Sequence, residues 1–301
     1  MRIILDGSVS TVKRLRVSLG TLVAIEATAD STSRAAVAIE AAFGAISQVD
    51  HRIHPHTAGS DLARINGSPL HVPVKVHPSV GQLLNLARRL NGLTDGVFDP
   101  CLPAQPGRLS DIVVSDDETE VVCHAPVTLD FGGFAKGYAV DCAAEALMAA
   151  GCTAGLVNAG GDLRVFGLRT EPLFVRGPGG ELINIELTDA ALAVSDIGSQ
   201  QRPAEHQGYY VRGCGDARTA SPAEAPPGAQ NAASPAASPA ASRAAPAPYA
   251  AVIATTAVIA DALTKCVLLC APPVATRALN AFDAICANHS LPASDATEPR
   301  T

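Results

Sequence analysis

The sequence contains no tryptophan, and aromatic residues make up only 4% of the chain. It therefore offers few side chains that could stack on the bases of a single-stranded nucleic acid. A basic surplus is also missing, because 29 acidic residues outnumber 22 Lys and Arg and give a net charge of −7. Since a nucleic-acid backbone is held mainly by positive charge, we expect no nucleic-acid partner. An acidic protein that handles phosphates is expected to use a metal ion as a mediator.

Long apolar runs and paired cysteines are missing as well. No run of eighteen apolar residues occurs, and residues 1–20 hold neither the apolar segment of a signal peptide nor a lipobox. We therefore expect a cytoplasmic protein without a membrane span. The eight cysteines form no CxxC pair, which favours reduced thiols in the core. The segment "HRIHPH" (51–56) has no Cys or acidic residue at a zinc-like spacing, so a zinc site is disfavoured.

Hydrophobic periodicity predicts a mixture of helices and strands. Apolar residues recur at helical spacing in three segments, of which the last is closed by Gly151: 31–50, 79–92 and 137–151. Alternating or β-rich runs predict strands in these segments: 19–29, two short runs within 120–131 broken by Pro126, a strand–turn–strand over 154–167, and further strands over 173–195. Residues 250–270 predict a strand followed by a helix. Because no regular βαβ repeat is present, the fold class is α+β, with mixed or antiparallel sheets and flanking helices.

One segment has a composition unlike the rest. Residues 219–249 are rich in Ala, Pro and Ser and contain few large apolar side chains. Too little apolar surface is available to offset the entropy of ordering, so we expect a disordered insertion. The expected organisation is one domain made of residues 1–218 and 250–290, interrupted by this insertion and followed by a flexible tail over 291–301.

The segment "LDFGGFAKGYAVD" (129–141) is the most suggestive of chemistry. It is neither a Walker A loop nor a GxGxxG fingerprint, because Lys136 is followed by Gly137 and the glycine spacing differs. Glycines beside a lysine at a helix start can still bring backbone N–H groups and positive charge to an anion. Asp130 could accept a hydrogen bond from a sugar or ring N–H. The alternative is a tight strand-to-helix turn with a solvated lysine.

Three further segments have weaker signals. "NGLTDGVFDPCLPA" (91–104) is either a ligand loop or a common acid-rich turn. "VNAGGDLRVFG" (157–167) is either a plain hairpin or a close backbone approach to a ligand. In "ADALTKC" (260–266), Asp261 and Thr264 share a helix face and could offer oxygen atoms to Mg²⁺. The alternative for this last segment is an acid placed near a helix N-terminus.

Taken in order along the chain, these segments resemble the ApbE family, the FAD:protein FMN transferases. The resemblance runs from about residue 18 to 271 and rests on "LGTLVAIEA", "SDLARING", "TDGVFDP", "LDFGGFAKGYAVD", "LVNAGGDLRVFG" and "IADALTKCVLL". It implies an ApbE-like, T-fold-related architecture. It also implies Mg²⁺-assisted transfer of the FMN moiety of FAD to a Thr or Ser hydroxyl of a target flavoprotein, with release of AMP.

The same resemblance implies which residues surround the flavin. Val97, Phe98 and Asp99 would line the flavin site. Leu19 occupies a position where the family often has a methionine against FAD. His56 occupies the place of a tyrosine that packs near the isoalloxazine ring in many members, and an imidazole can also stack there.

A second group of residues is implied for the phosphates and the metal. Asp130 and Lys136 would contact FAD, while the Gly133 carbonyl and Asp261 would be ligands of Mg²⁺. Asp261 is also the expected catalytic residue through that metal. The attacking hydroxyl would come from the target protein, so no nucleophile is expected in this chain.

Two departures from the family pattern affect the metal motif and the region that closes over the nucleotide. The family usually has ADAxxT, but here the last position is Lys265 and the threonine comes one residue earlier, as Thr264. Either Thr264 serves as the ligand, or water completes the shell, or Lys265 replaces part of the charge of the metal. In "GCGDARTA" (213–220), Gly213 occupies a position where the family has histidine. These departures leave two alternatives open: a degenerate FAD-binding member with weak or no transfer, and a Mg²⁺-dependent FAD pyrophosphatase that makes FMN and AMP.

Overall fold

A large antiparallel sheet, a layer of helices and a smaller lobe make up the part of the chain that the structure describes, residues 9–177, 180–196 and 249–288. The structure is a computed structural model. The large sheet has the strand order β1-β2-β6-β7-β10-β11-β12. Its strands are β1 (Ser10–Ser18), β2 (Thr21–Ala29), β6 (Ala154–Ala159), β7 (Asp162–Gly167), β10 (Ala191–Asp196), β11 (Tyr249–Ala254) and β12 (Ile285–Cys286). Every neighbouring pair is antiparallel.

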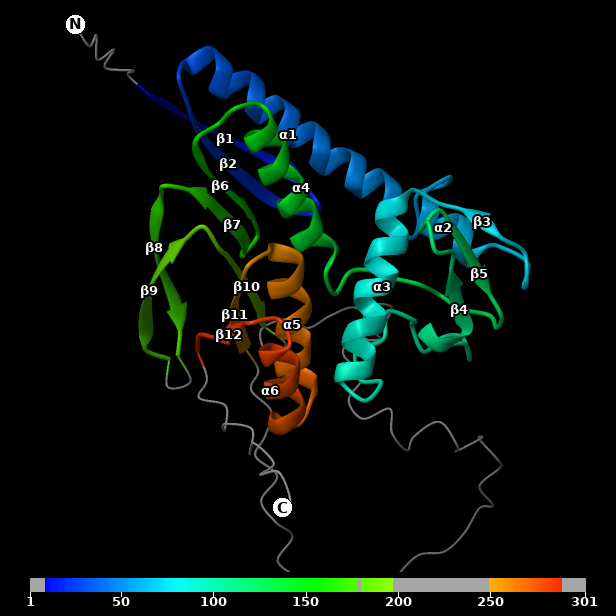
Figure 1. Cartoon of the computed structure of the whole chain (residues 1–301). Helices are drawn as coiled ribbons and strands as arrows, with labels where there is room; N and C mark the ends of the chain where they lie inside the picture. The colour runs from blue at the N-terminus through cyan, green and yellow to red at the C-terminus, as the bar shows by residue number, and fades with distance from the viewer. Residues whose placement is uncertain (1–8, 178–179, 197–248, 289–301) are drawn as a thin grey trace, which may run out of the picture.

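Three long helices cover one face of this sheet (Figure 1). They are α1 (Thr32–Ile53), α4 (Ala135–Ala149) and α5 (Ala257–Leu269). Strand β2 shows why they pack there, because its alternate residues Val23, Ile25, Ala27 and Ala29 are fully buried. The other face is covered by the hairpin of β8 (Thr170–Arg176) and β9 (Leu182–Thr188), whose Val175 and Leu187 join a second apolar cluster.

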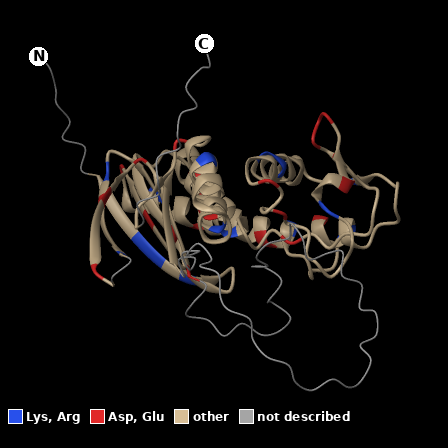
Figure 2. Ribbon diagram, turned by 90° about the horizontal axis from the view of Figure 1, so that it is seen from below, with Lys and Arg blue, Asp and Glu red and all other residues tan. Residues whose placement is uncertain are grey.

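The smaller lobe lies on the far side of the helix layer from the large sheet (Figures 1 and 2). It contains α2 (Asp61–Asn66), α3 (Pro78–Leu93), the short helix η1 (Leu109–Asp111), and a three-stranded sheet of β3 (Val74–Lys75), β5 (Glu120–Cys123) and β4 (Ile112–Val114). Helix α6 (Pro272–Asn280) connects the two parts, because its Arg277 donates a hydrogen bond to the Leu93 carbonyl at the end of α3.

The α+β prediction is confirmed, and so are the three helices predicted from residues before 152. The predicted strand–turn–strand over 154–167 is also present as β6 and β7. The second strand-like run predicted within 120–131 is wrong: after β5, the chain makes only an isolated bridge between Leu129 and Cys101. After this bridge, the chain continues into α4. The predicted disordered insertion over 219–249 and the tail over 291–301 lie outside the described residues, apart from Tyr249.

Within the described residues, none of the helices has the length and apolar character needed to cross a bilayer. The described cysteines are all free thiols, as the scattered spacing predicted.

Helices α4 and α5 cap each other through two aspartates. The carboxylate of Asp141 on α4 accepts hydrogen bonds from the backbone N–H groups of Ala257 and Val258, both at 2.8 Å, at the start of α5. In return, Asp261 on α5 accepts a hydrogen bond from the backbone N–H of Gly137 on α4, at 3.1 Å. These N–H groups have no partner within their own helices, so the two carboxylates satisfy them across the interface.

We expect Asp141→Ala to lower the free energy of unfolding by ~2 kcal/mol, because two N–H groups at the start of α5 lose their acceptor. Burial raises the pKa of Asp141 to about 6, against the opposing effects of the two N–H donors and of Arg164. Chemical denaturation at pH 8, where the carboxylate is charged, is the appropriate measurement. Glu145→Ala, at an exposed position of the same helix, is the matched control. An equal effect of the two substitutions would contradict the capping role.

Candidate functional site

Two cavities meet at Asp130. The first encloses about 400 Å³ between the end of α1, the β1–β2 turn and the start of α4. Its lining includes four of the residues predicted from the sequence: Leu19, His56, Asp130 and Lys136. The second is smaller, and it is lined by Asp130 together with Val97, Phe98, Asp99, Gly133 and Lys265. The structure thus brings together all the predicted site residues except Asp261 and Thr264, which lie fully buried beneath the surface.

Leu19 lies at the tip of a two-residue hairpin turn. Strand positions Ser18 and Thr21 pair directly, and both residues between them have positive φ, 52° for Leu19 and 69° for Gly20. This is the pattern of a type I′ turn, which glycine and asparagine favour and a leucine adopts with strain. The turn brings Leu19 to the wall of the first cavity, and backbone strain kept at such a position favours a functional role for this residue.

Asp130 is positioned by contacts of its segment with the smaller lobe. Asn66 at the end of α2 forms a reciprocal pair with the Leu129 backbone, donating to its carbonyl at 2.9 Å and accepting from its N–H at 2.7 Å. The N–H of Asp130 donates to the Pro100 carbonyl at 3.0 Å. The Asp130 carboxylate then accepts from the N–H of Gly132 at 2.7 Å. The segment "SDLARING" therefore contributes by fixing Asp130 beside the Asp99 loop.

The α4 N-terminus faces these cavities without a side-chain cap of its own. A Cβ added to Gly133 would meet no protein atom within 4 Å, and the φ of Gly133 is not in the left-handed region. No protein contact therefore requires glycine at this position. Space kept open beside a helix N-terminus suits an anionic ligand that approaches the backbone closely.

Asp261, Thr264, Lys265 and Ser195 form a buried polar group at the base of the second cavity. The Lys265 ammonium pairs with the Asp261 carboxylate and donates to the Ser195 hydroxyl at 3.0 Å. The Ser195 and Thr264 hydroxyl oxygens are 2.7 Å apart, and Thr264 donates to the backbone carbonyl of Asp261 at 2.7 Å. Because the Thr264 proton goes to that carbonyl, Ser195 must donate its own proton to Thr264.

A second buried acid lies next to this group. Asp162 follows the Gly160-Gly161 turn, where both glycines have positive φ, and its carboxylate pairs with Lys136. Burial raises the pKa of Asp162 to about 6; the negative charge of Asp261 adds to the rise, while Lys136 and Lys265 oppose it. Its Oδ1 atom has no hydrogen-bond partner within the described part of the chain.

Asp141, Asp162 and Ser195 are residues around the candidate site that sequence reasoning missed. Two of them stand within segments already singled out, at the end of "LDFGGFAKGYAVD" and after the glycine pair in "VNAGGDLRVFG". An acid directly after a Gly-Gly turn was the available signal for Asp162. Ser195 gave no signal, because its partners lie about 70 residues further along the chain.

The buried group does not fit Mg²⁺ as it stands. One Asp261 oxygen accepts from the Lys265 ammonium, and the other accepts from the Gly137 N–H. The Thr264 hydroxyl is occupied by two hydrogen bonds, and an ammonium adjoins the only carboxylate among the predicted ligands. Mg²⁺ requires oxygen ligands in a near-octahedral arrangement. Among the described residues, no three His, Cys, Asp or Glu side chains form a metal-binding group either.

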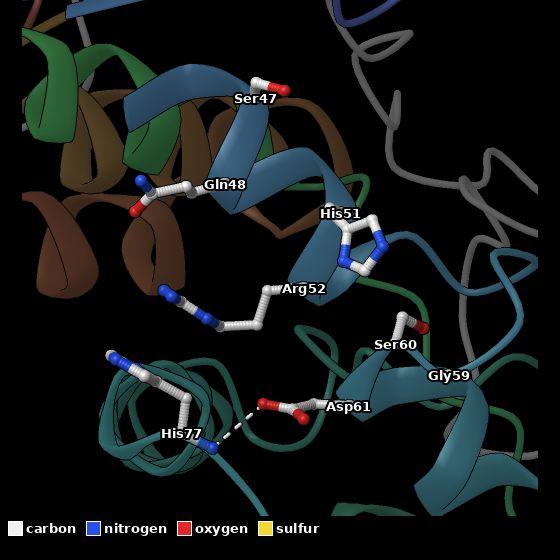
Figure 3. Close-up of a pocket in the computed structure, with 8 residues that line it drawn as sticks. All are labelled: Ser47, Gln48, His51, Arg52, Gly59, Ser60, Asp61 and His77. Atoms are coloured by element: carbon white, nitrogen blue, oxygen red, sulfur yellow. Dashed lines mark hydrogen bonds between the residues drawn. The ribbon is translucent and has the colours of Figure 1, made fainter. Parts of the chain in front are cut away.

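A separate hollow of about 490 Å³ lies between the end of α1 and the starts of α2 and α3 (Figure 3). Its lining contains Arg52, His51 and His77, but none of the predicted site residues. Asp61 there accepts from the His77 backbone N–H at 2.9 Å, which joins α2 to the start of α3. This hollow is therefore distinct from the pair of cavities at Asp130.

The family model of the ApbE family matches residues 19–105 and 104–227 of this chain. The chain belongs to the ApbE family. The family match ends before α5, so the assignment of Asp261 and Lys265 to the site rests on the structure and not on that match. The "GCGDARTA" segment with Gly213 lies outside the described residues.

Solved ApbE structures share the fold. The flavinyl transferase ApbE from Pseudomonas stutzeri, in its apo form, matches with a TM-score of 0.68 and 18% identity over 94% of this chain and 92% of its own. The flavin transferase ApbE from Vibrio cholerae gives 0.67 and 18% over 92% of each chain. The ApbE protein from Thermotoga maritima gives 0.63 and 21% over 91% of this chain and 88% of its own. A comparison with curated proteins gave no match.

Proposed function

We propose that this ApbE-family protein transfers the FMN moiety of FAD to a Thr or Ser hydroxyl of a target flavoprotein and releases AMP. The observation that carries the proposal is the convergence of the predicted flavin and phosphate residues on two cavities that share Asp130. Family membership and the fold shared with the related flavin transferases support it.

The proposed arrangement gives each part of FAD a place. The isoalloxazine ring would lie against Leu19 and His56 or against Val97 and Phe98, because each set lines a cavity together with Asp130. Asp130 would accept a hydrogen bond from the ring or the ribityl chain.

The pyrophosphate would lie at the α4 N-terminus, where Lys136, Lys265 and open space at Gly133 favour negative charge.

The chemistry is a phosphoryl transfer. The acceptor hydroxyl oxygen forms a bond to the phosphorus on the FMN side, the bridging P–O bond breaks, and AMP leaves with the bridging oxygen. The hydroxyl proton is released to the surroundings. In such reactions the protein mainly positions the groups and neutralises charge, which is the task that Lys136, Lys265 and the helix N-terminus would perform. The family resemblance implies Mg²⁺ in this scheme, but the hydrogen bonds and the ammonium at Asp261 do not favour it.

Product analysis tests the proposal. The purified protein is incubated with FAD, with and without a peptide carrying an acceptor threonine, and the products are separated by chromatography. Covalent FMN on the peptide, with AMP in equal amount, is the expected result. Free FMN and AMP formed equally well without the peptide would instead identify a pyrophosphatase. Bound but intact FAD would identify a binding protein.

A further inference from the structure

The hydrogen bonds of the buried group at Asp261 are complete without any ion. They run from the Lys265 ammonium to Ser195, from Ser195 to Thr264, and from Thr264 to the Asp261 carbonyl. The hydroxyl groups of Ser195 and Thr264 each donate one hydrogen bond and accept one. Both hydroxyl groups of the network are satisfied, and insertion of a cation would break several of its bonds.

The two fully buried acids next to the cavity each form an ion pair. Two carboxylates, Asp162 and Asp261, are paired with two ammonium groups, Lys136 and Lys265. Both carboxylates are fully buried, and the Lys265 side chain is only 8% exposed. A divalent cation added here would lie beside an ammonium in a place of low dielectric, where like charges repel strongly.

Lys265 is nevertheless part of the cavity wall. It lines the smaller cavity together with Asp130 and Gly133, although its partners Asp261 and Ser195 hold it from behind. An ammonium has three N–H donors, and Asp261 and Ser195 accept two of them. The remaining donor suits an anionic oxygen in the cavity, since charge-assisted hydrogen bonds to phosphate are among the stronger ones.

We infer that Lys265 is a built-in cation that takes the place of a divalent metal at the pyrophosphate subsite, so that FAD binds to this protein without metal. The inference rests on the proposed function, because it assumes that the cavity receives the pyrophosphate of FAD. Asp261 then acts as a positioning residue, which holds the ammonium at the cavity wall and caps α4 at the same time.

Exchanging the built-in cation for an oxygen ligand tests this inference. FAD affinity is measured by flavin fluorescence for the full chain in a chelator and in Mg²⁺. The wild-type protein is expected to give the same Kd in both. Lys265→Thr is expected to bind FAD at least ~10-fold more weakly in chelator, and Mg²⁺ is expected to restore the affinity, because the freed Asp261 carboxylate and the new hydroxyl can then hold an ion.

Lys265→Met is the matched control, since it keeps the length of the side chain but supplies neither charge nor oxygen. This variant is expected to bind FAD weakly with or without Mg²⁺. A cooperative thermal unfolding transition is used to check that each variant is folded. Wild-type binding that requires Mg²⁺, or that persists undiminished in both variants, would overturn the inference.

A titration of the FAD-free protein with Mn²⁺, followed by electron paramagnetic resonance, separates this inference from the proposed function. Lys265→Thr is expected to bind Mn²⁺ saturably and the wild-type protein is not. Equal Mn²⁺ binding by both would overturn the inference even if FAD transfer is observed. If no variant binds FAD, the proposed function fails, and the Mn²⁺ result still decides whether Lys265 occupies a cation site.

Discussion

Asp261→Ala is expected to abolish flavin transfer and to lower the free energy of unfolding by ~3–5 kcal/mol, because it leaves the Lys265 ammonium buried without its counter-charge. The substitution also removes the acceptor of the Gly137 N–H at the start of α4. Both losses fall on groups that are buried in the described structure. Chemical denaturation measures the loss of stability, and product chromatography measures the loss of transfer.

Two companion variants separate charge from fold. Asp261→Asn keeps an acceptor for the Gly137 N–H but removes the charge, so it should lose less stability than Asp261→Ala and still bind FAD poorly. The double variant Asp261→Ala with Lys265→Ala removes both charges, and it should be more stable than Asp261→Ala alone, because no unpaired ion remains. Full stability and full transfer in Asp261→Ala would reject the site.

Gly137→Ala is expected to lower the free energy of unfolding by ~1–3 kcal/mol and to impair FAD binding, because the added methyl group overpacks the α4–α5 contact. A Cβ at Gly137 would lie 2.3 Å from the Ala257 carbonyl oxygen and 2.8 Å from the Asp261 Cβ. Neither atom belongs to a flexible side-chain end, so α5 must move and carry Asp261 and Lys265 away from the cavity. Denaturation and FAD titration on the same sample measure the two effects together.

Gly44→Ala is the matched control for this prediction. Gly44 is an exposed glycine within α1, and an added Cβ there would meet no atom within 4 Å. Replacing it with alanine should therefore stabilise the protein by ~0.5–1 kcal/mol and leave FAD binding unchanged. Equal behaviour of the two variants would show that close helix packing at Gly137 does not position the site.

Helices were predictable from the sequence where an apolar stripe was regular. Residues 31–50 and 79–92 have that stripe and form α1 and α3. Strand β1 was missed because most of its side chains are exposed, with the basic residues of "VKRLRV" facing solvent, so no alternation of buried and exposed residues marks it. The segment around Leu129 was wrongly predicted to be a strand. It forms only an isolated bridge, with Cys101, which lies far away in the sequence.

The site was predictable in part, where regular helical spacing brings residues together. Asp261 and Lys265 are four residues apart, and helical spacing alone brings them to one face. The sequence left three ways to complete the metal site open: Thr264 as a ligand, water, or Lys265 in place of part of the metal charge. The ion pair of Lys265 with Asp261 favours the last of these. The contacts of Lys265 with Ser195 and of Lys136 with Asp162 depend on the folding of the large sheet, which no local pattern encodes.

The measurement that tests the central claim most directly is a transfer assay with FAD labelled at the FMN-side phosphorus, carried out in the presence of a chelator. The acceptor is a peptide or domain with a flavinylation-type threonine, and the products are separated under denaturing conditions. The account predicts that the label becomes covalently attached to the acceptor while unlabelled AMP is released, without added metal. Label that remains in intact FAD, or that appears only as free FMN, would contradict it.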